Sequence, residues 1–324
     1  MKILITGATG FVGSHLAESL AKDGHDIYAL VRNPKKAKEF NTPGVHIYGG
    51  LNSSKHCWID DLPEDLDVVI HTAGLLHTYK NEEFFEVNTN YTKTLLSDLN
   101  EKYQQLNFIF ISSQAAAGPG ERDESDKEGP VSQYGKSKLA AEIFLKNNIP
   151  SDWSLKIIRP PMVIGPRDPA ILDVFKMINK NHALITGLKG LKKEYSFINV
   201  YDLVDGIKKS IEHTENDTFF LAHPETVTFE KIICEIQSVL EKKRVIKVYI
   251  PTPVIKGVSG LMALTQKLFS HDLRLTPDKS KELMPEKWVC RPKKAEEKIL
   301  FKCSRSFSSS IKETHEDYKS RGWI

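Results

Sequence analysis

Three glycines at intervals of three residues follow the first strand-like stretch of the chain. Residues 2–6 are mostly apolar and β-branched, and residues 6–13 read TGATGFVG before a helical pattern begins. At such a junction Gly7 permits a tight turn, Gly10 lets backbone approach a ligand, and Gly13 lets helix and strand pack closely. The free N–H groups and positive dipole end of the helix then face the same ligand. The spacing predicts a Rossmann-type turn that binds a dinucleotide pyrophosphate.

Strand-like and helical patterns alternate through the first half of the chain. Strands are expected at 2–6, 25–31, 45–50, 66–74, 106–113 and 154–160. Longer helical patterns lie at 82–99 and 133–147. Short strands that are apolar on both faces and alternate with helices predict an α/β fold with a doubly wound parallel sheet.

The second half follows a looser rhythm of helices, with strand-like pieces at 217–223 and 244–250. We expect residues 1–165 to form a dinucleotide-binding Rossmann domain. Residues 166–324 are expected to form a smaller, mostly helical substrate-binding region over the carboxyl edge of the sheet, where such folds bind ligands. Part of 195–223 is expected to return to the Rossmann domain.

Composition excludes several classes of protein. The net charge of +3 comes from 45 basic and 42 acidic residues without a block of one sign, so no nucleic-acid partner is expected. The eleven histidines form no ligand motif, so no metal site is expected. The longest apolar tract, 254–269, is interrupted by lysines and too short to cross a bilayer, so no membrane partner is expected.

The cellular compartment is predicted from the chain start and from the cysteines. The sequence begins at Met1 directly with a strand-like stretch, which leaves no room for a signal peptide. The four cysteines show no C-x-x-C spacing and no disulfide framework. A cytoplasmic protein with reduced thiols is expected.

A tyrosine and a lysine share one face of a predicted helix in VSQYGKSKLAAE, residues 131–142. Residues four apart lie together on a helix, so Lys138 can lie beside Tyr134, whereas Lys136 points away. A nearby ammonium favours the phenolate and lowers the pKa of a tyrosine. Such a pair could move a proton to or from a substrate oxygen.

Five motifs occur in a characteristic order: TGATGFVG (6–13), HTAG (71–74), FISS (110–113), YGKSK (134–138) and RPPMVIGP (159–166). Together they resemble the motif set of the extended short-chain dehydrogenases/reductases, the NAD-dependent epimerase/dehydratase superfamily. The resemblance runs through essentially the whole chain, including the terminal DYKSRGWI. The stretch SSQAAAGPG and the tail most resemble the dihydroflavonol reductase and 3β-hydroxysteroid dehydrogenase-like branch.

This resemblance implies an NAD(P)-dependent enzyme with a Ser-Tyr-Lys site. Tyr134 would be the general acid/base, and Lys138 would lower its pKa and hold the nicotinamide ribose. Ser113 would hydrogen-bond the substrate oxygen, while strand alternation sends Ser112 to the opposite face. A structural hydrogen-bonding role is expected for Asn88. The expected cofactor contacts are Gly7, Thr9, Gly10, Phe11, Val12, Gly13, Arg32, Leu51, Ala73, Tyr134, Lys138 and Pro161.

The residue at the end of the second strand indicates whether the cofactor is NAD(H) or NADP(H). An acidic residue there favours the free hydroxyls of NAD, whereas an arginine favours the 2′-phosphate of NADP. This sequence has Arg32 at that point, which predicts NADP(H), with NAD as the alternative. Gly50 replaces an aspartate that often faces the adenine in this family, so Leu51 or backbone is expected to contact the ring.

Departures from the family favour simple oxidoreduction of a small-molecule carbonyl or alcohol. Met162 stands where nucleotide-sugar epimerases usually have an asparagine, and a thioether cannot donate to a diphosphate. Gln114 and Ala115 stand where dehydratases carry an acidic pair. Two alternatives remain: a nucleotide-sugar epimerase, and a non-catalytic dinucleotide-binding regulator. The resemblance also implies a homodimer joined by the helices at 82–99 and 133–147.

Overall fold

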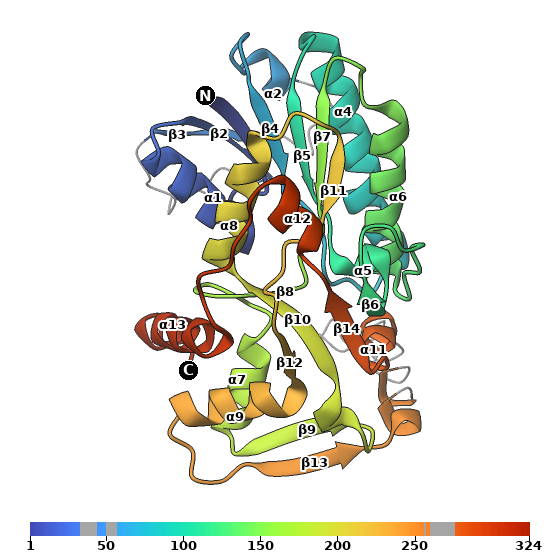
Figure 1. Cartoon of the computed structure of the whole chain (residues 1–324), viewed down its shortest axis with the longest axis vertical. Helices are drawn as coiled ribbons and strands as arrows, with labels where there is room; N and C mark the ends of the chain where they lie inside the picture. Colours follow the sequence, from blue (N-terminus) through green and yellow to red (C-terminus); the bar gives the residue numbers. More distant parts are fainter. Residues whose placement is uncertain (33–43, 50–56, 256, 260–275) are drawn as a thin grey trace.

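The computed structural model describes residues 1–32, 44–49, 57–255, 257–259 and 276–324. A seven-stranded sheet forms the larger lobe, at the top of Figure 1, with the strand order β11-β7-β5-β4-β1-β2-β3. All its neighbouring strands run parallel. Its strands are β1 (Lys2–Thr6), β2 (Asp26–Val31), β3 (Val45–Gly49), β4 (Val68–His71), β5 (Asn107–Ile111), β7 (Ser154–Ile158) and β11 (Asp217–Phe219).

Helices cover both faces of this sheet. One face carries α1 (Phe11–Lys22), α8 (Val200–Ile211) and α12 (Lys293–Lys298); the other carries α2 (Cys57–Asp60), α4 (Tyr91–Lys102) and α6 (Gln133–Asn148). The short helix α3 (Asn81–Phe85) and the π-helical turn η2 (Glu86–Asn90) lead into α4.

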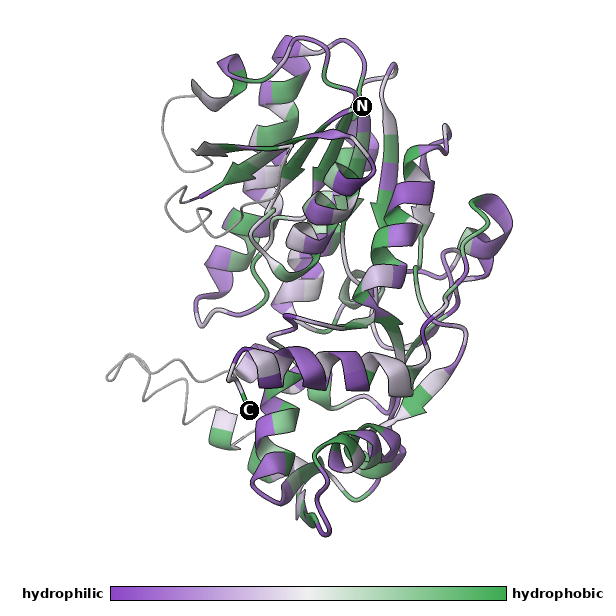
Figure 2. Ribbon diagram, turned by 90° about the vertical axis from the view of Figure 1, so that its left-hand side faces the viewer, coloured by the Kyte–Doolittle hydropathy of each residue, from purple (hydrophilic) through white to green (hydrophobic). Residues whose placement is uncertain are grey.

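Alternation along each strand divides the core in two. In β1, Ile3 and Ile5 enter the cluster beneath α1 and α8, whereas Leu4 enters the cluster beneath α4 and α6. Figure 2 shows the apolar residues concentrated in the strands and the hydrophilic residues gathered on the outer helices. A sheet buried on both faces accounts for the continuous apolar strands of the sequence.

The smaller lobe lies below the carboxyl edge of the large sheet (Figure 1) and combines helices with short strands. A five-stranded sheet contains β12 (Thr226–Thr228), β10 (Glu194–Asn199), β14 (Lys287–Cys290) and β6 (Gly120–Arg122) in this order, and β8 (Met162–Ile164) pairs with β10. A separate parallel pair consists of β9 (His182–Thr186) and β13 (Ile246–Ile250). The remaining elements are α5 (Gln114–Ala117), α7 (Leu172–Asn179), η3 (Gly190–Lys192), α9 (Phe229–Val239), α11 (Pro277–Leu283) and α13 (Phe307–Ser320).

The predicted doubly wound parallel sheet is confirmed. All six strands expected in the first half occur, and β11 adds a seventh beside β7. The strand expected at 66–74 ends at His71, because the chain then leaves the sheet to cross the glycine turn, where Ala73 N–H donates to Thr6 Oγ1 at 3.3 Å. None of the helices in the described ranges combines the length and apolar content that a bilayer span requires.

Candidate active site

Four strands of the large sheet end side by side at the edge that faces the smaller lobe. The order of the strands reverses at β1, which pairs with β2 on one side and with β4 on the other. Such a reversal opens a crevice at the carboxyl ends of the strands, where ligands bind. Gly7, Ala73, Ser113 and Pro161 come to this edge because they closely follow β1, β4, β5 and β7.

The glycine turn is packed too tightly for larger residues. Gly7 has a φ of +71°, and a Cβ added to it would lie 2.7 Å from the backbone nitrogen of Ala73. A Cβ on Gly13 would lie 2.2 Å from the Gly7 carbonyl oxygen. Gly10 N–H donates to that same oxygen at 2.8 Å. Both close approaches need glycine, which agrees with the roles expected for Gly7 and Gly13.

The start of α1 suits an anion. Gly10 is the N-cap residue, no side chain caps the helix, and its first turn contains no acidic residue. Thr9 and Gly10 are exposed, while Phe11 and Val12 are half-buried. The first N–H groups of a helix lack intrahelical partners and lie at its positive end. The residues present therefore fit the pyrophosphate of a nicotinamide dinucleotide.

Ser112 and Ser113 point to opposite sides of the chain after β5. Ser112 is buried and its hydroxyl donates to Glu142. Ser113 caps α5, where its Oγ accepts a hydrogen bond from Ala115 N–H at 3.1 Å, and its side chain also hydrogen-bonds with Tyr134. The structure thus brings Ser113, and not Ser112, to the tyrosine.

Lys138 lies one turn after Tyr134 on α6, but its amine points toward the sheet. The Nζ donates to the Ile111 carbonyl oxygen at 2.9 Å and lies 4.8 Å from the centre of the Phe110 ring. Burial lowers the pKa of Lys138 to about 8, although the nearby Glu142 carboxylate raises it. Lys136 is exposed, as expected.

The expected depression of the Tyr134 pKa is wrong for this structure. Burial raises the pKa of Tyr134 to about 12; the hydrogen bond with Ser113 lowers it, and the Glu282 carboxylate raises it further. The physical reason is that desolvation of the phenolate dominates, while the Lys138 ammonium is directed at Ile111. At neutral pH the phenol is therefore protonated and can donate a proton.

Asn88 joins the loop after β4 to the helix that carries Tyr134. Its Oδ1 accepts a hydrogen bond from Leu75 N–H at 2.7 Å, and its Nδ2 donates to the Leu75 carbonyl at 3.1 Å and to Ser137 Oγ at 2.9 Å. These bonds engage both polar atoms of the buried side chain. The contacts agree with the structural role expected for Asn88.

Two residues of α11 that the sequence did not indicate form hydrogen bonds with the start of α6, the tyrosine helix that carries Tyr134. The Asp278 carboxylate accepts hydrogen bonds from Gln133 N–H at 2.7 Å and from Tyr134 N–H at 3.2 Å. The Glu282 carboxylate accepts one from Ser132 Oγ at 2.7 Å. No local sequence signal links these groups, because 144 residues separate Asp278 from Tyr134.

The expected adenosine contacts lie partly outside the described residues. Arg32 directly follows β2 and is exposed. Because Leu30 lies opposite Thr6 in the β1–β2 pairing, Arg32 is at the same edge as the glycine turn. Leu51 lies outside the described residues, so the expectation for it stays a prediction.

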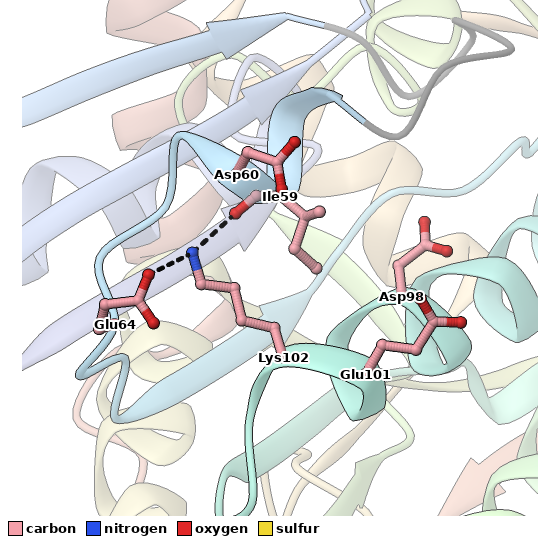
Figure 3. A pocket seen from close by; sticks show the side chains of 6 residues that line it. All are labelled: Ile59, Asp60, Glu64, Asp98, Glu101 and Lys102. Carbon is pink, nitrogen blue, oxygen red and sulfur yellow. Dashed lines mark hydrogen bonds and ion pairs between the residues drawn. The ribbon is translucent and has the colours of Figure 1, made fainter.

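A surface hollow of about 370 Å³ lies at the opposite edge of the large sheet and is lined by Ile59, Asp60, Glu64, Asp98, Glu101 and Lys102 (Figure 3). The Lys102 amine donates to the Ile59 carbonyl at 3.1 Å and pairs with Glu64 at 3.1 Å. These bonds tie the segment around α2 to the end of α4. We assign this hollow to packing.

Among the described residues, one group of three ligand-type side chains gathers around β11. Atoms of His213, Glu215 and Asp217 lie within 4.8 Å of one another. Lys294 pairs with Asp217, and Lys298 pairs with Glu215 at 3.2 Å. Because lysines already neutralise both carboxylates, we assign the group to an ion-pair network.

Comparison with known proteins places the chain in a family. Residues 3–222 match the sequence model of the NAD dependent epimerase/dehydratase family. The chain is 28% identical over 287 residues to the decarboxylating sterol-4-alpha-carboxylate 3-dehydrogenase of Dictyostelium discoideum, covering 83% of this chain and 85% of the relative. It is 30% identical over 259 residues to the UDP-glucose 4-epimerase of Vibrio cholerae, covering 74% of this chain and 76% of the relative.

The fold is also similar to solved structures. UDP-glucuronic acid 4-epimerase from Bacillus cereus in complex with NAD superposes with a TM-score of 0.77 at 21% identity, covering 99% of each chain. This similarity concerns the fold, and the family match covers well over half of the sequence. The glycine turn and the tyrosine helix thus belong to an enzyme of the NAD-dependent epimerase/dehydratase family, the extended short-chain dehydrogenases/reductases.

Proposed function

We propose that this enzyme interconverts a carbonyl and an alcohol on a small or lipid-like substrate. The observation that carries the proposal is the hydrogen bond between Ser113 and the protonated Tyr134 phenol, at the edge where the glycine turn lies. A bound nicotinamide supplies or accepts the hydride. In the reducing direction Tyr134 gives its proton to the substrate oxygen as the C–H bond forms, and in the oxidising direction it takes that proton back.

The residues around Tyr134 would position the substrate and stabilise the negative charge that forms on the phenol oxygen. Ser113 would hydrogen-bond the substrate oxygen through its hydroxyl, whose oxygen is held in place by the hydrogen bond from Ala115 N–H. Lys138 would hold the nicotinamide ribose, and its charge would compensate the phenolate that forms after proton transfer. Ala73 and Pro161 would border the cofactor from β4 and β7.

The residue after Ser113 favours oxidoreduction over elimination. Gln114 is buried at the start of α5, and its Nε2 has no hydrogen-bond partner among the described residues. A neutral amide cannot protonate a departing hydroxyl, so the acid that dehydratases place there is missing. The sterol dehydrogenase relative supports a lipid-like substrate. We assign substrate recognition to residues after about 166.

We also propose that NADP(H) is preferred over NAD(H). The exposed Arg32 guanidinium at the end of β2 would form two parallel hydrogen bonds to a 2′-phosphate. The similar structure from Bacillus cereus is a complex with NAD. Because similarity of fold does not determine the preferred cofactor, the preference of this enzyme has to be measured directly.

The test is turnover by the purified protein. Sterol, long-chain and small carbonyl compounds should each be incubated with NADPH and with NADH, and the absorbance of the reduced cofactor followed. We expect oxidation of the cofactor with at least one carbonyl and none without substrate. Binding of cofactor without turnover of any carbonyl or alcohol would instead support a non-catalytic regulator.

A nucleotide-sugar epimerase is the second candidate, favoured by the similarity to UDP-glucose 4-epimerase. Against it stands Met162 in β8, where a thioether replaces the amide that contacts the diphosphate in epimerases. Calorimetry with UDP-glucose and UDP-glucuronic acid separates the two proposals. Binding together with 4-epimerisation, without net cofactor oxidation, would overturn the oxidoreductase assignment.

A further inference from the structure

The two-stranded sheet of β9 and β13 lies at the bottom of the smaller lobe in Figure 1, and several of its apolar side chains are exposed. In the parallel pair of β9 and β13, Val248 lies opposite Leu184. Alternation along β9 buries Ala183 and Ile185 in the core of the lobe and leaves Leu184 48% exposed. Residues 246–249 of β13 are all exposed, and Ile246 and Val248, with 53% and 39% of their surface exposed, lie on the same side of the pair as Leu184.

A fourth residue extends this surface. Leu188 follows the end of β9 and is 92% exposed. It lies at the end of β13 because its neighbour Gly187 donates a hydrogen bond to the Ile250 carbonyl at 2.9 Å. We call Leu184, Leu188, Ile246 and Val248 the apolar face.

Exposed large apolar side chains are concentrated around the apolar face. Of the fourteen large apolar side chains that are exposed among the described residues, eight lie between Leu184 and Val258, and one of these eight, Tyr201, belongs to α8 on the large sheet. Single exposed apolar residues are ordinary, whereas a contiguous group indicates a surface that contacts something apolar.

Basic residues flank both ends of the apolar face. Lys242, Lys243 and Arg244 precede β13, and Lys189 and Lys192 follow β9. Within the part of the chain that the structure describes, Lys189 pairs with Glu286 at 3.2 Å, while no carboxylate pairs with Lys192, Lys242, Lys243 or Arg244. Segments 187–193 and 241–247 together contain seven basic residues and one acidic residue, Glu241. Of the basic residues, Lys189 and Lys247 are ion-paired and Lys193 is buried, so Lys192, Lys242, Lys243 and Arg244 carry the charge of the basic ends.

We propose that the apolar face and its basic ends dock on a membrane surface that contains anionic lipids. The apolar side chains enter the boundary between headgroups and acyl chains, and the cationic ends pair with anionic headgroups. A second copy of this chain fits less well. A two-fold interface places the same surface on both partners, which would bring unpaired lysines and arginines together.

This contact is peripheral and needs no spanning helix. It differs from the expectation from sequence that the protein has no membrane partner, which rests on the lack of an apolar tract long enough to cross a bilayer. The surface lies on the smaller lobe, whereas Tyr134 is on α6 of the larger lobe, so the proposal goes beyond the proposed reaction and does not depend on it.

The test is co-sedimentation of the full chain with vesicles. Phosphatidylcholine vesicles are compared with vesicles that also contain phosphatidylglycerol, at about 0.05 M and about 1 M salt. We expect binding to the anionic vesicles at low salt, and little binding to phosphatidylcholine alone or at high salt. Absence of binding to the anionic vesicles, or equal binding to both kinds at both salt concentrations, would overturn the proposal.

Matched variants locate the contact. The double variant Lys243→Glu/Arg244→Glu and the single variant Leu188→Asp should each weaken binding at least about tenfold. The controls Lys22→Glu/Lys127→Glu and Leu300→Asp change exposed residues of the same kinds elsewhere and should bind like wild type. If the control variants lose as much vesicle binding as the variants of the apolar face and its basic ends, or if the latter bind like wild type, this location is wrong. Light scattering that shows a dimer broken by Leu188→Asp, without vesicle binding by the wild type, would identify a second copy as the occupant.

Discussion

Asp278 provides a tertiary cap, beside the N-cap residue Ser132, for the helix that carries Tyr134: its Oδ2 accepts a hydrogen bond from the Tyr134 N–H at 3.2 Å. The smaller lobe thereby reaches the catalytic helix of the larger lobe through a charged group. A carboxylate at a helix start satisfies free N–H groups and interacts favourably with the positive end of the helix dipole. We infer that Asp278 is a positioning residue that acts through Tyr134.

The first prediction concerns Asp278→Ala. Loss of this cap should lower the free energy of unfolding by about 0.5–2 kcal/mol and reduce kcat more than it raises KM, because the phenol is held less firmly. Thermal unfolding and steady-state kinetics measure the two effects. Asp278→Asn keeps one acceptor oxygen and should recover part of both. The exposed Lys293→Ala on α12, which pairs with Glu297 and not with Asp278, is the control; a kcat effect there equal to that of Asp278→Ala would contradict the positioning role.

Tyr134→Phe should abolish the chemical step while leaving cofactor affinity close to wild type. The substitution removes the transferable proton and keeps the ring that packs 6.2 Å from Phe84. General acid/base catalysis contributes about 10²–10⁴-fold, so residual turnover above about a tenth of wild type would rule out the assigned role. Fluorescence titration of the reduced cofactor gives the matching binding measurement.

The pKa of Lys138 predicts how activity depends on pH. Burial places its pKa at about 8, so the ammonium is present below that pH and lost above it. Reductase activity should therefore be steady through neutral pH and fall above about pH 8. Tyr134, with its pKa raised to about 12, remains protonated throughout this range. Lys138→Arg keeps a charge that does not titrate, so the fall should move to higher pH, even if the maximum rate is lower. An unchanged alkaline limb in this variant would assign the titration to another group.

Arg32→Asp should reverse the proposed cofactor preference. A charge-assisted hydrogen bond contributes about 1.5–3 kcal/mol, which is roughly a ten- to hundredfold change in NADPH affinity. NADH affinity should change little, because the introduced carboxylate can accept a hydrogen bond from the free ribose hydroxyl. Lys22→Asp, at the end of α1, is the control for general loss of positive charge. A wild type that prefers NADH, or a variant with the same preference as wild type, is incompatible with this assignment.

We propose a homodimer formed through the outer surfaces of α4 and α6. On α6, Ile143 is 51% exposed, and Leu139, Ala140 and Phe144 are only half-buried, so an apolar strip faces away from the subunit core. Ile143→Asp should convert a dimer into a monomer, as measured by light scattering at micromolar concentration. Lys146→Asp, farther along the same helix, should leave the dimer intact. A wild-type monomer at this concentration would end the proposal.

Local sequence was sufficient for the nucleotide-binding half of the fold. The central strands β1, β4, β5 and β7 are buried on both faces, and the helical stretches of α1, α4 and α6 lie close to them in sequence, so the pattern is visible in short windows. The glycine turn is equally local: Gly7 and Gly13 meet across a single strand–helix junction. The neighbours of Ser113 likewise follow from strand alternation, which sends Ser112 to Glu142 and Ser113 to Tyr134.

Only the tertiary structure decided what surrounds Tyr134 and which surfaces remain exposed. Spacing along a helix predicted that Lys138 lies one turn from Tyr134, but the pKa of the phenol depends on burial, on Ser113 and on Glu282, which comes from the smaller lobe. The short strand β14 pairs with β6, although 168 residues separate Trp288 from Gly120, and no local pattern encodes such a pairing. The sequence by itself determined the parallel sheet and its glycine turn, because those depend on neighbours in the chain. Desolvation, the Asp278 cap and the apolar face depend on groups that meet only after folding.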